Sequence, residues 1–236
     1  MWGAAAVFVA AWLMMSRIDR RPFRSLGFER GPALRETLIG LALGAGMIAA
    51  AVGSMWVGGW ARLGSIGPFS GVTLASLGGA VLFNAVTQEV LFRGYVLQSV
   101  ESVSSVNVAL LVSSVLFTLL HAGAIVEGGV LSGVNLFAAG LLLGLAYTAT
   151  RNLWLPVGLH FSWNFLQGPV LGISVSGVAL DSGLELVRLD GPRLLTGGAF
   201  GLEGGLVGTA VTVLAALALI LRFPSSLTPH RGHWAG

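Results

Sequence analysis

Long apolar stretches divide the chain, and short polar segments separate them. A helix needs about 20 apolar residues to cross a bilayer core of about 30 Å. The candidate spans are residues 1–15, 37–60, 70–100, 106–122, 131–149, 153–167 and 204–222. The first is short for a span, and polar residues interrupt the third. The pattern predicts an all-α fold, a polytopic transmembrane helical bundle of about seven spans within a range of six to eight.

The stretches also suggest how the chain is organised. We expect a short N-terminal span and an Arg-rich loop, then one helical domain with a polar motif core, and then a C-terminal tail. These parts correspond to residues 1–36, 37–222 with the core at 70–170, and 223–236.

Residues 168–202 contain Gly, Pro and several charges, and we expect them outside the membrane. Within them, residues 171–190 partly alternate between apolar and polar positions. Such alternation could form a short hairpin, an amphipathic segment on the bilayer surface, or a lid over a site.

Composition narrows the class of protein. Hydrophobic residues make up 55% of the 236 residues and charged residues 10%, against about 25% charged residues in soluble proteins. A soluble enzyme, a disordered chain and a nucleic-acid-binding domain are therefore excluded. The absence of cysteine excludes disulfides and thiolate metal sites. We expect membrane lipid as a partner and no nucleic acid.

The charges predict an orientation in the membrane. All 13 basic residues are arginines, the net charge is only +3, and six of the arginines lie between positions 17 and 35. The positive-inside rule then makes the 16–36 loop cytoplasmic. The Arg-only, Ala/Gly/Leu/Val-rich composition is typical of a GC-rich bacterial genome. We therefore expect a multi-pass protein of the cell membrane, specifically of a bacterial plasma membrane.

A few polar residues fall inside the apolar stretches. An ionisable group inside a span costs several kcal/mol, so each one is a functional candidate. The candidates are Gln88, Glu89 and Arg93 in the third stretch, His121 at the end of the fourth, and His160 and Asn164 in the sixth.

Their spacing predicts that they meet. Glu89 and Arg93 are four residues apart and share a helix face. The polar turn at 102–107 lies at similar distances from Glu89 and His121, so an antiparallel hairpin would bring these two to nearly equal depth. His160 lies fewer residues from the turn that precedes it. It therefore reaches the same depth only if its helix is tilted or offset.

These residue types are suited to hydrolysis. A carboxylate with a histidine can take a proton from water, and a second histidine with an asparagine can donate hydrogen bonds to an oxyanion. Alternatively, Glu89, His121 and His160 could hold a divalent metal such as zinc. The HExxH zinc-protease motif is absent, and we favour a site with no cofactor. In the purely structural interpretation, these groups form a buried ion pair and interhelical hydrogen bonds.

Three motifs carry a resemblance to a known family. The segment 88–94, QEVLFRG, resembles the EExxxR motif of the CPBP intramembrane protease family. That family includes the type II CAAX prenyl endopeptidases and the bacterial Abi and bacteriocin-immunity proteins. Residues 117–121 match its FxxxH motif, and residues 160–164 match HxxxN. The Gly-rich stretch 196–205 also resembles bacterial members.

The resemblance implies a multi-helix intramembrane endopeptidase that acts on a membrane-associated protein or peptide. The first-motif carboxylate and His121 would activate water, and His160 and Asn164 would hold the oxyanion. Arg93 would orient the carboxylate.

One position departs from the family pattern. The motif begins with two glutamates, and the first is usually given the water-activating role, but this chain has Gln88 there. Glutamine cannot act as a general base. Either Glu89 takes over through a local helix adjustment, or the protein is slow or inactive and serves as a membrane scaffold, immunity or maturation factor. A small proton-coupled transporter is a further alternative.

Overall fold

The structure is a computed structural model, and it describes residues 22–224. The predicted first span at 1–15, the beginning of the Arg-rich loop and nearly all of the tail lie outside this part of the chain. Within it the fold is helical apart from one small sheet, which confirms the predicted all-α bundle.

The helices follow the apolar stretches closely. The α-helices are α2 (Ala33–Val57), α3 (Gly71–Glu89), α4 (Gln98–Val103), α5 (Val106–Leu120), α6 (Ala122–Gly128), α7 (Val130–Thr150), α8 (Trp154–Phe165), α9 (Arg193–Thr196) and α10 (Leu206–Arg222). π-Helical segments extend two of them, η3 (Val90–Leu97) after α3 and η4 (Leu166–Val170) after α8. Short 3₁₀ turns are η2 (Phe23–Leu26), η5 (Gly198–Phe200) and η6 (Leu202–Gly204).

Three helices of the described part are long and apolar enough to cross a membrane: Ala33–Val57, Gly71–Val103 and Val130–Thr150. Val106–Leu120 and Leu206–Arg222 are apolar but shorter. The helices therefore bear out a membrane bundle, while the number of about seven spans stays a prediction.

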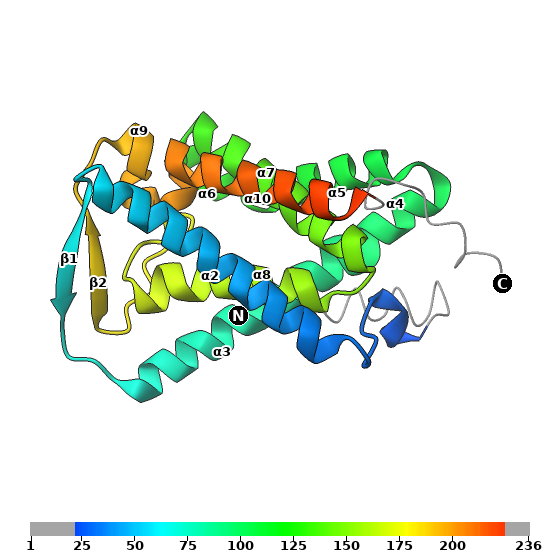
Figure 1. Ribbon diagram of the computed structural model, residues 1–236, viewed down its shortest axis with the longest axis horizontal. Helices are drawn as coiled ribbons and strands as arrows, with labels where there is room; N and C mark the ends of the chain where they lie inside the picture. Colours follow the sequence, from blue (N-terminus) through cyan, green and yellow to red (C-terminus); the bar gives the residue numbers. More distant parts are fainter. Residues whose placement is uncertain (1–21, 225–236) are drawn as a thin grey trace.

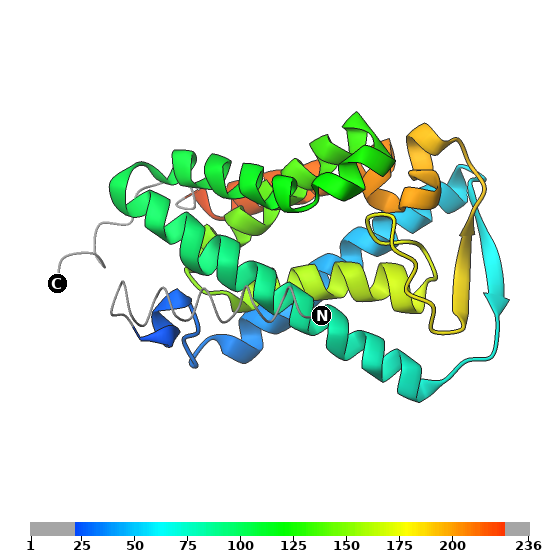
Figure 2. The ribbon, with the colours of Figure 1, turned by 180° about the vertical axis from the view of Figure 1, so that it is seen from behind.

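The longest helix carries the first motif. It begins at Gly71, where the Ser70 hydroxyl accepts a hydrogen bond from the backbone N–H of Thr73, as an N-cap does. It runs without a break through the π-helical segment η3 to Val103. A π-helical turn inside an α-helix often marks a functional site, and this one contains Arg93. Figure 2 shows this helix crossing the front of the molecule, with α8 behind it.

Helices α2 and α8 lie side by side because small residues let their backbones approach (Figure 1). A methyl group built on Gly40 would overlap Leu155 O and would lie 2.8 Å from Leu159 N. Gly158, on the facing side of α8, would meet Thr37 O in the same way, at 2.6 Å. Close approach through small residues is the usual packing of helices in lipid, and here it fixes α8, the helix that carries the third motif.

We therefore expect Gly40→Ala to destabilise the fold. The new methyl group meets backbone atoms of α8, which cannot move aside, and such overpacking costs about 1–3 kcal/mol. Gly46→Ala on the same helix is the matched control, because nothing lies within 4 Å of its built methyl group. Denaturant titration in detergent micelles measures both, and equal stabilities would contradict this packing.

The small sheet pairs two distant segments. Strand β1 (Ala61–Ile66) runs antiparallel to β2 (Leu184–Leu189), with Ala61 opposite Leu189 and Ile66 opposite Leu184. Strand β2 therefore does not form a hairpin within residues 171–190, because its partner lies far away in sequence, just after α2; inside that segment a single antiparallel bridge joins Val175 and Val178. The sheet lies at one end of the bundle (Figure 1) and holds the 171–190 segment to that end.

Candidate active site

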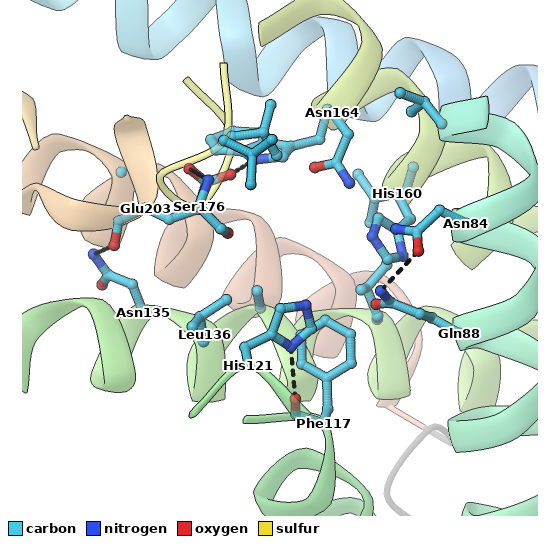
Figure 3. Close-up of a pocket in the computed structure, with 18 of the residues that line it drawn as sticks. Asn84, Gln88, Phe117, His121, Asn135, Leu136, His160, Asn164, Ser176 and Glu203 are labelled. Carbon is cyan, nitrogen blue, oxygen red and sulfur yellow. Dashed lines mark hydrogen bonds between the residues drawn. The ribbon is translucent and has the colours of Figure 1, made fainter. Parts of the chain in front are cut away.

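The polar motif residues converge on one cavity of about 490 Å³. Its polar lining includes side chains from α3, α5, α7 and α8, from the 175–180 loop and from the Gly-rich segment: Asn84, Gln88, His121, Asn135, His160, Asn164, Ser176 and Glu203. Figure 3 shows these side chains around the open space. Of the six predicted site residues, Gln88, His121, His160 and Asn164 line the cavity.

The rest of the cavity wall is apolar. Met47, Leu77, Phe117, Leu142 and Leu159 are among the residues that form it. A mostly apolar hollow with a few convergent polar groups is typical of a binding site for an organic ligand or peptide.

Glu89 and Arg93 lie behind this cavity and not in its lining. Both side chains are fully buried. Arg93 Nη1 donates to Glu89 Oε1 at 3.0 Å, and Arg93 Nη2 donates to the backbone oxygen of Gly140 at 2.7 Å. His160 Nδ1 lies 2.8 Å from the same Glu89 oxygen. The predicted pairing of Glu89 with Arg93 is thus present, and it extends to His160 on α8.

The directions of Gln88 and Glu89 on the helix decide whether Glu89 can take the place of Gln88 at the cavity. Consecutive positions on a helix point about 100° apart, and the helix turns Gln88 toward the cavity and Glu89 away from it. The π-helical segment begins only at Val90, after both residues. Glu89 therefore contacts His160 and does not line the cavity beside His121.

His121 ends α5, where it caps the helix. Its Nδ1 lies 2.8 Å from the backbone oxygen of Phe117. Because a carbonyl oxygen only accepts, Nδ1 carries the proton and the neutral ring keeps a lone pair on Nε2. The Phe117 ring supports the imidazole at a centroid distance of 4.8 Å, and the Arg93 guanidinium covers the same ring, with Cζ 4.8 Å from its centroid.

His160 is oriented in a similar way, but by a charge. Its Nδ1 donates to the Glu89 carboxylate, which fixes the ring and leaves Nε2 for the cavity. Asn164 follows one turn later on α8 and lines the same cavity. The Asn164 amide, and His160 Nε2 when it carries a proton, can therefore donate to the same ligand group.

Gln88 is held by its neighbour on α3. Its Nε2 donates to Asn84 Oδ1 at 3.3 Å, one turn earlier. Its Oε1 is buried and forms no hydrogen bond within the described residues. An unpaired buried acceptor is costly, so a rotation of the amide that brought Oε1 to a donor would be favourable.

The alternative metal set of Glu89, His121 and His160 is not assembled. Across residues 22–224, no group of three His, Asp or Glu side chains is arranged to hold a metal ion. Nδ1 of each histidine is already engaged, by Glu89 in one case and by Phe117 in the other.

Among the cavity residues that sequence reasoning missed, Glu203 is the acidic one. It lies in η6 within the Gly-rich segment and is buried. Burial raises the pKa of its carboxyl above the ordinary value, although hydrogen bonds from Gln167, Trp163 and the Ser176 backbone oppose that rise. The available signal was an acidic residue immediately before an apolar helix, inside a segment otherwise made of glycine and apolar residues.

One comparison with known proteins gives a match, and it covers part of the chain. Residues 70–166 match the family model described as "Type II CAAX prenyl endopeptidase Rce1-like". The matched segment contains all three motifs and ends before Glu203. No curated protein and no solved structure was found to match the chain.

Proposed function

We propose that the chain is an intramembrane endopeptidase, because residues 70–166 match the family model described as type II CAAX prenyl endopeptidase Rce1-like. It hydrolyses a peptide bond of a membrane-associated protein or peptide at the membrane surface. The observation that carries this proposal is the convergence of Gln88, His121, His160 and Asn164, from three helices, on one largely apolar cavity. The protein acts in a bacterial plasma membrane with its 16–36 loop in the cytoplasm.

His121 is the general base in this mechanism. Its Nδ1–H is engaged by the Phe117 carbonyl, so Nε2 takes a proton from a water molecule in the cavity. The resulting hydroxide attacks the carbonyl carbon of the peptide bond. His121 then returns the proton to the leaving amine, which completes hydrolysis without a cofactor.

His160 and Asn164 stabilise the oxyanion that forms in this attack. Glu89 contacts Nδ1 of His160 at 2.8 Å and fixes the orientation of the ring, so that Nε2, when it carries a proton, donates to the oxyanion. Arg93 holds Glu89 in place. Glu89 and Arg93 are thus positioning residues in this proposal.

Gln88 takes a limited role. It lines the cavity, but an amide cannot remove a proton from water. The same residue supports a second candidate, an inactive relative that binds a membrane partner through the intact cavity and acts as a scaffold, immunity or maturation factor.

The two candidates differ in the effect of Gln88→Glu. In an active enzyme that relies on His121 alone, a carboxylate at position 88 adds a second base beside the water. We expect kcat for a quenched membrane-peptide library to rise by about 10- to 100-fold, less than the full contribution of a general base because His121 already supplies one. The purified chain in nanodiscs, with Asn84→Asp as a matched control one helical turn away, gives the measurement.

If the wild-type chain cuts peptides, the endopeptidase proposal stands. If only Gln88→Glu cuts, the native protein is the inactive relative and its function is binding. If neither form cuts any peptide, the endopeptidase proposal fails.

A further inference from the structure

Glu203 is a carboxylate without a countercharge at the cavity. It is the only acidic residue that lines the cavity in the described part of the chain, and none of the ion pairs found within residues 22–224 includes it. A buried charge that is not paired is strongly unfavourable. A site with this imbalance favours a ligand that brings the missing positive charge.

The surroundings of Glu203 are built for its charged form. Its Oε1 accepts from Trp163 Nε1 at 2.8 Å, and its Oε2 accepts from Gln167 Nε2 at 2.7 Å and from the Ser176 backbone N–H at 3.4 Å. Asn135 Nδ2 donates to the backbone oxygen of Glu203 at 2.8 Å. Each of these partners donates, and donors stabilise a carboxylate more than a carboxylic acid. The carboxylate is therefore oriented as well as buried.

One oxygen remains free to bind. A carboxylate oxygen has two lone pairs, and within residues 22–224 Oε1 accepts a hydrogen bond from Trp163 alone. Figure 3 shows Glu203 and Ser176 on one side of the cavity and Gln88 and His160 on the other. A peptide whose scissile bond lies at the histidines would reach Glu203 with a neighbouring group.

We propose that Glu203 binds a protonated amine or guanidinium group of the peptide substrate and makes the enzyme selective for a positive charge beside the cleaved bond. This inference rests on the proposed endopeptidase function. Two sources supply that chemistry, a Lys or Arg side chain and a free N-terminus.

The charge of the site should also depend on pH. The groups packed against the Glu203 carboxyl (Trp163, Gln167 and the Ser176 backbone) do not titrate, and the titratable groups in the same cavity are His121 and His160. Burial raises the pKa of Glu203, so the carboxylate gains a proton, and the site loses its charge, at a higher pH than an exposed glutamate would.

Binding of matched peptides tests the proposal. The probe is an apolar host peptide with one Lys at a scanned position, against the same peptide with norleucine there, each with a free and an acetylated N-terminus. Affinity is measured with the His121→Ala chain in nanodiscs, so that cleavage does not interfere. We expect the Lys peptide or the free-amine peptide to bind about tenfold more tightly than its neutral counterpart, as for one charge-assisted hydrogen bond.

Glu203→Gln in the same background should abolish this preference, while Glu185→Gln, an exposed glutamate on β2, should leave it intact. If Glu203→Gln fails to fold, the chain that keeps Glu203 is tested alone. Lowering the pH must then remove its preference for the charged peptides. Equal affinities for charged and neutral peptides, or no binding of either, would overturn the proposal.

Cleavage by the wild-type chain separates this inference from the function on which it rests. A preference in binding without any cleavage leaves the cation site standing and removes the endopeptidase. Cleavage of charged and neutral peptides at equal kcat/KM keeps the endopeptidase and removes the cation site.

Discussion

Arg93→Met is expected to lower the free energy of unfolding by about 3–5 kcal/mol, the cost of leaving one partner of a buried ion pair uncompensated. The guanidinium has no exposed surface and contacts both Glu89 Oε1 and Gly140 O. Methionine fills much of the same volume but supplies neither contact. Glu89 would keep only His160, and its second oxygen already has no partner among the described residues. Denaturant titration in detergent micelles measures the change.

Two comparisons isolate the cause. Arg62→Met removes an arginine whose side chain is 73% exposed and whose Nε lies 3.4 Å from Asp190 Oδ2. Exposed ion pairs contribute at most about 1 kcal/mol to stability. The double variant Glu89→Gln with Arg93→Met removes both charges and should recover part of the loss. If Arg93→Met and Arg62→Met destabilise the protein equally, the buried network does not stabilise the fold as we describe.

The sequence predicted the helices and the convergence of the motifs well, for a clear physical reason. Apolar stretches of span length have few alternatives in lipid, because the backbone must satisfy its own hydrogen bonds there. Polar residues within them then indicate a site. Gln88, His121, His160 and Asn164 all line the cavity for this reason.

The direction of individual side chains could not be predicted in the same way. The hairpin argument predicted that Glu89 lies level with His121, but depth does not determine which face of the helix a residue occupies. In the structure Glu89 contacts His160. That contact depends on how closely α8 packs against its neighbours, which small residues on α2 such as Gly40 determine.

Segments outside the spans were the least predictable. Strand β2 pairs with β1 across more than a hundred residues of chain, and no local pattern specifies such a partner. Glu203 enters the cavity because the Gly-rich segment folds back over α8, where Trp163 and Gln167 hold its carboxylate. Sequence spacing alone gives no indication of that contact.

His121→Ala is expected to reduce kcat for peptide cleavage by about 10²- to 10⁴-fold, the usual contribution of a general base. His121 is the one cavity imidazole in the described chain that no carboxylate engages, and Gln88 cannot replace it. Binding of the peptide depends on other walls of the cavity, so KM should change little. Single-turnover assays in nanodiscs with a cleavable membrane peptide give both constants.

Two further measurements distinguish loss of the base from loss of the fold. Leu119 lies two residues earlier and is 59% exposed, so Leu119→Ala should leave kcat unchanged. Added imidazole should restore part of the activity of His121→Ala, because the missing ring leaves space beside Phe117 and a free base can occupy it. Cleavage at the wild-type rate by His121→Ala would show that water is activated elsewhere. Loss without rescue, together with lowered stability, would make His121 a structural cap of α5.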